Sequence, residues 1–175
     1  MNINTVKDYF EAQAPSRIRY RKSKAYYWNS ITKYCDYFIH DEYSVLEIGC
    51  GTGELIANVK GNRKLGIDFS EKMIDEARKQ FPEADFKVME AENLELDEKF
   101  DVIILSNIIG VLDDIEQVFK QLKKISHSQT KIIISYYNSF WEPFIHFAEF
   151  IHLKRRSPKQ SWLSGKDIMN LLYLA

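Results

Sequence analysis

The chain has little cysteine, no excess of charge of either sign and no long hydrophobic run. Its two cysteines, Cys35 and Cys50, cannot build a disulfide framework or a zinc site. A formal net charge of −1 excludes a globally cationic surface, so nucleic acid or a membrane surface would have to bind a local patch. No apolar run approaches the roughly 18 residues of a membrane span, and the opening MNINTVKDYF lacks signal-peptide character. We therefore expect a cytoplasmic protein.

The four histidines do not suggest a metal centre. His146 and His152 are six residues apart, so they would face different sides of a helix. His40 and His127 lie near predicted loops, away from the carboxyl ends of the strands, and we interpret them as surface residues. We expect no bound metal ion.

Short β-like segments alternate with helix-like ones, a pattern typical of a mostly parallel sheet covered by helices on both faces. The length of 175 residues fits one α/β domain. The predicted strands are residues 43–48, 63–68, 84–89, 101–106 and 131–137. The predicted helices lie within residues 23–39, 69–82, 113–125, 141–153 and 162–175, with Ser70 and Ser164 as N-caps.

The segment VLEIGCGTGE, residues 45–54, joins the first predicted strand to a loop with three glycines. Such glycines let the backbone turn sharply and approach a ligand closely, and a doubly wound sheet binds its ligand at this end of the strands. The spacing G-x-G-x-G is not the dinucleotide fingerprint G-x-G-x-x-G, and no G-K-[ST] ending marks a phosphate loop. Glu47 would repel a pyrophosphate but would suit a cationic ligand. Alternatively, Glu47 is a structural carboxylate that caps nearby amides.

VLEIGCGTGE closely resembles the first motif of class I S-adenosylmethionine-dependent methyltransferases. In that family, the loop wraps the methionine and ribose portions of the cofactor, and the acid lies beside the methionine moiety. Three further stretches resemble the family's next motifs, in the family's order: GIDFS at 66–70, VMEAENL at 88–94 and FDVIILSNIIGVLDD at 100–114. The resemblance implies a Rossmann-like fold, S-adenosylmethionine as the cofactor and S-adenosylhomocysteine as the product.

The motifs also imply individual cofactor contacts. Asp68 would accept hydrogen bonds from both ribose hydroxyls, and Phe69 and Met73 would flank the adenine unless they are ordinary core residues. Glu90 would accept from the adenine amino group and the backbone amide of Ala91 would meet the ring, although many relatives have Asp at position 90. The alternative for Glu90 is a solvated charge. The implied cofactor-binding residues are Glu47, Gly49, Cys50, Gly51, Gly53, Asp68, Phe69, Met73, Glu90, Ala91, Glu92, Ser106 and Asn107.

Methyl transfer from a sulfonium is an in-line displacement that depends mainly on positioning and on exclusion of water. Many relatives have an acid-histidine pair after the fourth strand, where this chain has Gly110 and Val111, so no catalytic residue is identified. We expect methyl transfer to a small-molecule or glycoconjugate acceptor. A non-catalytic cofactor-binding domain and an RNA- or lipid-directed methyltransferase remain open. A weak resemblance to methyltransferase domains fused to glycosyltransferases favours sugar- or lipid-linked acceptors.

Substrate recognition is expected from the aromatic segments that flank the core. Residues 17–30 mix basic and aromatic side chains, and in the family an N-terminal helix often closes over the cofactor. Such side chains are alternatively simple packing, or a local patch for nucleic acid or anionic lipid. The substrate candidates are Tyr20, Tyr26, Tyr27, Tyr136, Tyr137, Asn138 and Trp141.

The expected organisation has three parts: an N-terminal helical lid (1–40), a cofactor-binding core (41–140) and a C-terminal helical segment (141–175). Family members usually complete a seven-stranded sheet with two more strands, which this sequence lacks. We therefore expect a truncated C-terminal segment. An open sheet edge invites association with another chain or with a fused C-terminal domain.

Overall fold

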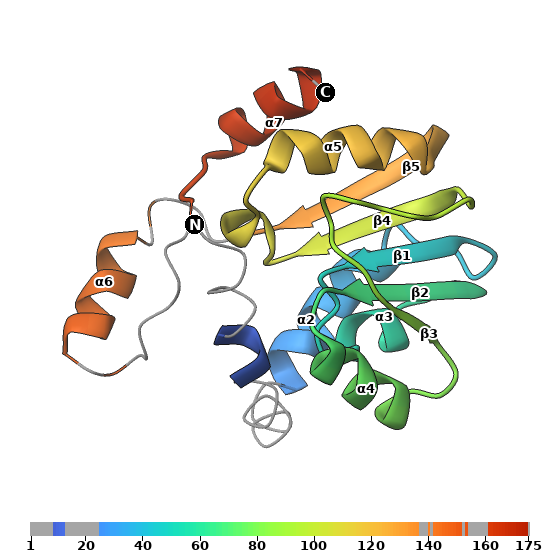
Figure 1. Cartoon of the computed structure of the whole chain (residues 1–175), viewed down its shortest axis with the longest axis horizontal. Coiled ribbons are helices and arrows are strands. Elements are labelled where there is room, and N and C mark those ends of the chain that lie inside the picture. The colour runs from blue at the N-terminus through green and yellow to red at the C-terminus, as the bar shows by residue number, and fades with distance from the viewer. Residues whose placement is uncertain are drawn as a thin grey trace.

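The computed structural model describes residues 9–12, 25–136, 140, 142–151, 153 and 161–174. Its centre is a parallel sheet with the strand order β3-β2-β1-β4-β5 (Figure 1). The order reverses between β1 and β4, and parallel α/β sheets bind ligands beyond the carboxyl ends of the strands at such a switch point. The strands are β1 (Ser44–Ile48), β2 (Arg63–Asp68), β3 (Asp85–Val88), β4 (Phe100–Ser106) and β5 (Ser126–Ser135). The predicted doubly wound α/β architecture is confirmed.

Helices follow most of the strands, and two N-caps were predicted correctly. The Ser70 hydroxyl oxygen accepts the N–H of Met73, and the Ser164 hydroxyl oxygen accepts the N–H of Asp167. Helix α3 was not predicted because five residues are too few to show a helical period. The helices are α2 (Ala25–Asp36), α3 (Glu54–Asn58), α4 (Glu71–Gln80), α5 (Ile115–Lys124), α6 (Glu142–Phe150) and α7 (Gly165–Leu174), with a 3₁₀ turn η2 (Ile109–Val111). Residues 9–12 are also helical.

The sheet separates two hydrophobic cores. Alternate residues of a strand point to opposite faces, so Leu46 packs in one core with Phe119 and Ile168, from α5 and α7. Val45 packs in the other core, with residues such as Ile74 of α4. Figure 1 shows α5 and α7 on one side of the sheet and α2, α3 and α4 on the other. This layering buries the central strands on both faces and fixes the positions of their carboxyl ends.

Strand β5 differs from its prediction. It begins at Ser126 rather than at residue 131, and its pairing with β4 shifts register between Phe100 and Val102. The polar stretch 126–130 carries no apolar run, which is why sequence patterning assigned it to a loop. His127, which the sequence placed near a loop, therefore lies in a strand, and its side chain is partly exposed at the amino end of the sheet.

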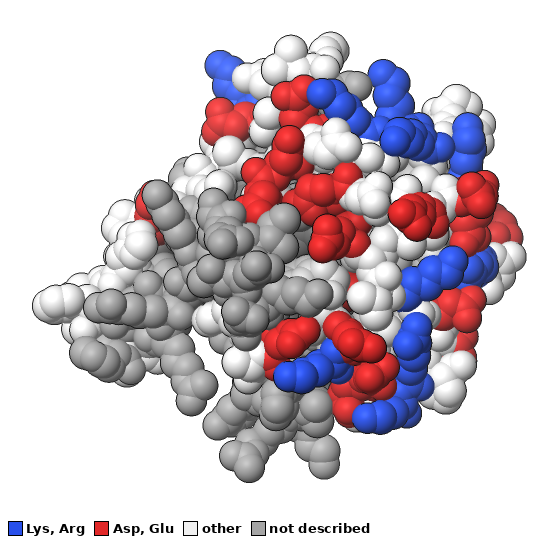
Figure 2. All heavy atoms as spheres, in the orientation of Figure 1, with Lys and Arg blue, Asp and Glu red and all other residues white. Residues whose placement is uncertain are grey.

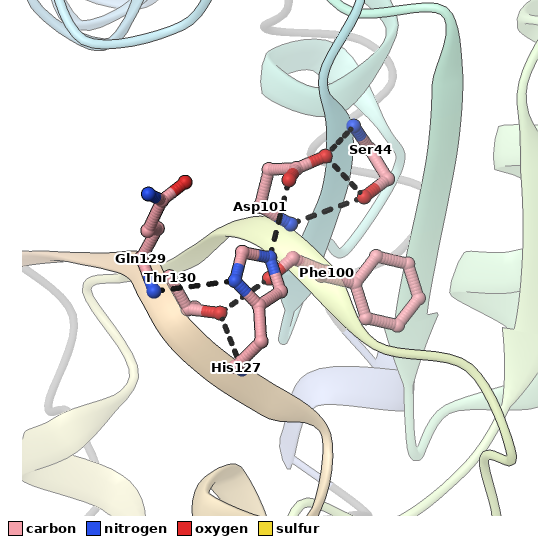
Figure 3. A network of polar contacts seen from close by, with 6 residues as sticks. All are labelled: Ser44, Phe100, Asp101, His127, Gln129 and Thr130. Atoms are coloured by element: carbon pink, nitrogen blue, oxygen red, sulfur yellow. Dashed lines mark hydrogen bonds and ion pairs between the residues drawn. The ribbon is translucent and has the colours of Figure 1, made fainter.

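A polar network joins three strands at their amino ends (Figure 3). The backbone N–H and the hydroxyl of Ser44 donate to Asp101 Oδ2 at 2.8 and 2.7 Å, and His127 Nε2 lies 3.1 Å from Asp101 Oδ1. The Thr130 hydroxyl accepts the N–H of His127 and donates to the carbonyl of Phe100. Partial burial alone would raise the pKa of Asp101, but the hydrogen bonds from Ser44 and His127 hold it below its ordinary value. The network ties β1, β4 and β5 together at the edge opposite the switch point.

Strands β3 and β5 are the edges of the described sheet. Association through the β5 edge, or with a fused domain, stays a prediction. None of the helices in the described ranges has the length and apolar character needed to cross a membrane.

Candidate cofactor and acceptor sites

The loop between β1 and α3 turns on glycines with left-handed backbone. Gly49, Gly51 and Gly53 have φ angles of 73°, 54° and 84°. A Cβ atom at Gly49 would lie 2.7 Å from the Ile108 side chain, and one at Gly53 would lie 2.8 Å from the ring of Phe86. Backbone conformation and close packing together require glycine at positions 49 and 53.

Asp68 ends β2 beside this loop and is almost fully buried. Its Oδ2 accepts the N–H of Gly51 and its Oδ1 accepts the N–H of Ser70, both at 2.9 Å. Each carboxylate oxygen can accept more than one hydrogen bond. The side chain therefore holds the loop in place and can still accept from a ligand.

Glu47 is 1% exposed, and its Oε2 accepts the N–H of Ile56 at 2.9 Å in the first turn of α3. Burial raises the pKa of Glu47 well above its ordinary value; the amide hydrogen bond opposes this rise, and the negative charges of Glu54 and Asp68 add to it. The carboxylate thus caps one backbone amide, in line with the structural alternative. Its place beside a cationic ligand stays a prediction.

A hollow lies beyond the carboxyl ends of β1 and β2, with about 600 Å³ of empty space when the part open to solvent is included. We call it the first hollow. Four acids line it, and none of its described lining residues is Lys or Arg. Figure 2 shows acidic side chains gathered near the middle of the face in view. Such a site favours a cationic ligand over a phosphate. The lining residues are Ile48, Gly49, Asp68, Phe69, Met89, Glu90, Ala91, Glu92, Ile108, Val111, Leu112 and Asp113.

Two N-terminal segments reach this edge of the sheet. The ring of Phe10 meets that of Phe69 edge-on, with 6.0 Å between centroids, and Glu11 forms an ion pair with Lys72. Residues 9–12 therefore lie against a residue that lines the first hollow. From α2, the hydroxyl of Tyr27 accepts a hydrogen bond from the side-chain amide of Asn107. These contacts place N-terminal residues where the sequence expected a lid; closure over a cofactor stays a prediction.

A second hollow of about 400 Å³ shares one lining residue, Val111, with the first. It lies at the carboxyl ends of β4 and β5. The backbone N–H of Ser161 donates to the carbonyl of Gly110 at 2.8 Å, which holds the segment before α7 against η2. The residues that line the second hollow are Asn107, Ile109, Gly110, Val111, Tyr136, Ser161, Trp162 and Leu163.

The structure brings many of the predicted site residues together and separates others. Cys50 is buried in the core, and so is Met73, for which the core was one of two predicted alternatives. Ser106 shares a hydrogen bond with Ser135. Tyr26 is 86% exposed and lines neither hollow. The predicted residues that line the first hollow are Gly49, Asp68, Phe69, Glu90, Ala91 and Glu92, whereas Asn107 and Tyr136 line the second. Tyr20, Tyr137, Asn138 and Trp141 lie outside the described residues.

Sequence reasoning missed the apolar walls of both hollows. Met89, Ile108 and Leu112 have the hydrophobic character of core residues, so pattern alone does not separate them from core. Residues 161–163 are far from η2 in the chain, and only the fold brings them together. No local signal in the sequence could have identified them.

Comparison with known proteins decides the family. Residues 39–174 match the family model described as a methyltransferase domain. The chain belongs to the methyltransferase domain family. This match confirms the resemblance to S-adenosylmethionine-dependent methyltransferases and, at the level of the family, the expected enzyme class and cofactor. The link to glycosyltransferase fusions stays a prediction.

Known relatives of this methyltransferase domain agree with the match. The malonyl-[acyl-carrier protein] O-methyltransferase of Bacillus anthracis is 35% identical over 92 residues, which are 49% of this chain and 34% of the relative. The chain spans 34 to 45% of the length of the first four curated relatives that it matches.

Two solved structures share the fold. A SAM-dependent methyltransferase of Thermotoga maritima has a TM-score of 0.78 at 22% identity, covering 97% of this chain and 79% of that one. The magnesium protoporphyrin IX methyltransferase of Synechocystis PCC 6803, with bound SAH, has a TM-score of 0.73 at 19% identity, covering 97% and 86%. At these identities the likeness shows the fold of the domain.

Proposed function

We propose that this methyltransferase domain binds S-adenosylmethionine in the first hollow and catalyses methyl transfer to a small-molecule or glycoconjugate acceptor. The observation that carries the proposal is the hollow itself, in which an apolar floor, a left-handed glycine loop and four carboxylates meet at the switch point of the sheet. A cofactor with a sulfonium and an ammonium group suits these charges, whereas a pyrophosphate would be repelled.

The residues of the hollow fit the parts of this cofactor. Asp68 would accept from the ribose hydroxyls, and Glu90 from the adenine amino group. Gly49 leaves the backbone open to close approach. When bound, the cofactor supplies a methyl group on a positively charged sulfur. The apolar lining, to which Ile108 contributes, would keep water away from that sulfur.

An oxygen acceptor is supported by the printed names of several curated relatives, which are O-methyltransferases. We extend this to the present chain as part of the proposal. Cytoplasmic location stays a prediction from the sequence.

Calorimetric titration with S-adenosylmethionine, S-adenosylhomocysteine, NAD and ATP tests the cofactor site. We expect saturable one-site binding of the first two ligands only. Glu90→Gln keeps an oxygen acceptor and loses only the charge, so it should weaken S-adenosylmethionine binding about two- to tenfold, which corresponds to the net contribution of one ordinary hydrogen bond. Asp68→Ala should weaken it more, because two hydroxyl contacts are lost.

Glu95→Gln, on the same loop but outside the lining of the first hollow, is the matched control and should bind like the parent chain. Circular dichroism should show that each variant is folded. Parental affinity in both Asp68→Ala and Glu90→Gln would refute the cofactor site. Cofactor binding without S-adenosylhomocysteine formation from any acceptor would favour the non-catalytic alternative.

A further inference from the structure

We propose that the second hollow binds the methyl acceptor and selects an uncharged aromatic ring that carries a hydroxyl group. The inference rests on the proposed function, because it needs the cofactor in the first hollow. It assigns Asn107 to the acceptor, whereas the sequence motif had implied a cofactor contact.

The position of the second hollow suits an acceptor. Val111 lines both hollows, so the acceptor that we assign to the second hollow would share this contact residue with a cofactor in the first. The floor comes from the carboxyl end of β4 and from η2, and Tyr136 follows β5 directly. Ser161, anchored to Gly110 by its backbone N–H, closes another side. The second hollow is therefore shaped by the core together with the segment before α7.

The chemistry of the lining selects against charge. None of the eight described lining residues is Asp, Glu, Lys, Arg or His. A carboxylate or ammonium group that entered the second hollow would lose hydration without gaining an ion pair from any of these eight residues. A carboxylate would also meet the repulsion of the acids around the first hollow. Tyr136 and Trp162 offer aromatic surfaces, which bind planar rings well.

Asn107 supplies the polar contact. Its side-chain N–H₂ group donates to the hydroxyl of Tyr27 and, at 3.3 Å, to the hydroxyl of Ser106. The two N–H bonds are thus committed, and Oδ1 is the atom that can accept from a ligand hydroxyl. Asn107 has a φ of 58°, and it is the one non-glycine residue with positive φ in the described ranges. Such backbone conformations cluster at functional sites.

This contact orients the acceptor without a general base. A hydroxyl that donates to Asn107 Oδ1 would keep its oxygen lone pairs available for the methyl carbon. The lone pair forms the new O–CH₃ bond, the electron pair of the S–CH₃ bond returns to sulfur, and the hydroxyl proton passes to water. The products are the methyl ether and S-adenosylhomocysteine. A phenolic hydroxyl, with a pKa of about 10, gives up its proton far more readily than an alcohol, which favours an aromatic acceptor.

Four probes of similar size test this selectivity on the chain loaded with S-adenosylhomocysteine: 4-methylphenol, benzoate, benzylamine and toluene. The readout is the indole N–H signal of Trp162 in NMR, assigned with Trp162→Phe. We expect 4-methylphenol to shift this signal saturably, and benzoate and benzylamine to bind at least about tenfold more weakly. Toluene, which lacks the hydroxyl, should bind about five- to tenfold more weakly than 4-methylphenol.

Asn107→Gly removes the amide but tolerates the left-handed backbone. It should bring the affinity for 4-methylphenol to that for toluene and leave toluene binding unchanged. Turnover of 4-methylphenol by the parent chain, measured as S-adenosylhomocysteine release from S-adenosylmethionine, should fall in the same variant.

The outcomes separate the two proposals. If S-adenosylhomocysteine does not bind, the proposed function fails. If it binds with parental affinity in Asn107→Gly and the four probes follow the expected order, the acceptor assignment stands. Benzoate or benzylamine binding as tightly as 4-methylphenol, absence of any shift at Trp162, or weaker cofactor binding in Asn107→Gly would overturn the acceptor assignment while leaving the cofactor site intact.

Discussion

Glu47 has two proposed roles, a structural cap and an attraction for a cationic ligand, and one substitution tests both. Its carboxylate is buried, accepts one amide hydrogen bond and faces the negative charges of Glu54 and Asp68. Glu47→Gln keeps an oxygen that can accept from the Ile56 N–H and removes the buried charge. We therefore expect the ligand-free variant to be more stable than the parent at pH 8, by about 1–3 kcal/mol, the usual cost of a poorly compensated buried polar group.

The raised pKa of Glu47 also predicts how the stability difference between Glu47→Gln and the parent changes with pH. Because the folded-state pKa of Glu47 is raised, its contribution to stability is most favourable below the unfolded value of about 4.3. That contribution is lost as pH rises from there through the folded-state pKa. The stability difference between Glu47→Gln and the parent should therefore shrink from pH 8 to pH 5.

Urea unfolding at the two pH values, followed by circular dichroism, measures this difference. Calorimetry should show that the same variant binds S-adenosylmethionine at least about tenfold more weakly, because the carboxylate no longer attracts the cationic methionine moiety. A variant that is less stable at pH 8 and binds the cofactor normally would show that Glu47 is a structural cap alone.

Two further predictions concern residues that line neither hollow. Ser70→Ala removes the side-chain acceptor of the Met73 N–H and should lower the free energy of unfolding by about 1 kcal/mol. The control is Ser30→Ala in α2, whose exposed hydroxyl bond to Tyr26 should make the change smaller than about 0.5 kcal/mol. Equal effects of the two substitutions in urea unfolding would contradict the capping role. Asp101→Asn should cost about 0.5 kcal/mol at pH 7, a small value because the pair with His127 is partly exposed. Because the folded-state pKa of Asp101 is lowered, this carboxylate stabilises the fold at pH values above its unfolded-state pKa of about 3.9, and the stabilisation is lost as the pH falls further. Asp101→Asn should therefore lose less stability on acidification than the parent. Parallel acid-unfolding curves of the two proteins would contradict this.

The sheet and the cofactor side of the site were predictable because their signals are local. Apolar runs bounded by turn residues mark buried strands, and the glycines at 49 and 53 are required by their own backbone angles. Asp68 could be placed because it ends a strand beside the loop. The polar start of β5 could not be predicted, because its strand conformation is held by hydrogen bonds to Phe100 and Asp101 on another strand.

The acceptor side was less predictable for a physical reason. Its walls come from three separate segments, the end of β4, the end of β5 and the residues before α7, and no periodic pattern links them. Asn107 is an example of a contact that the sequence alone could not predict. The sequence placed it after β4, but only the structure shows that Tyr27, eighty residues earlier, accepts a hydrogen bond from its amide.

The two interpretations of Glu47 are compatible, because capping and ligand attraction use different parts of one group. The hydrogen bond to Ile56 occupies Oε2 and fixes the carboxylate at the base of the glycine loop. Burial and the neighbouring acids make that fixed charge unfavourable in the free chain. A cationic ligand would relieve the same unfavourable charge. The destabilising feature of the free domain is therefore the feature that would favour a sulfonium cofactor over a neutral or anionic one.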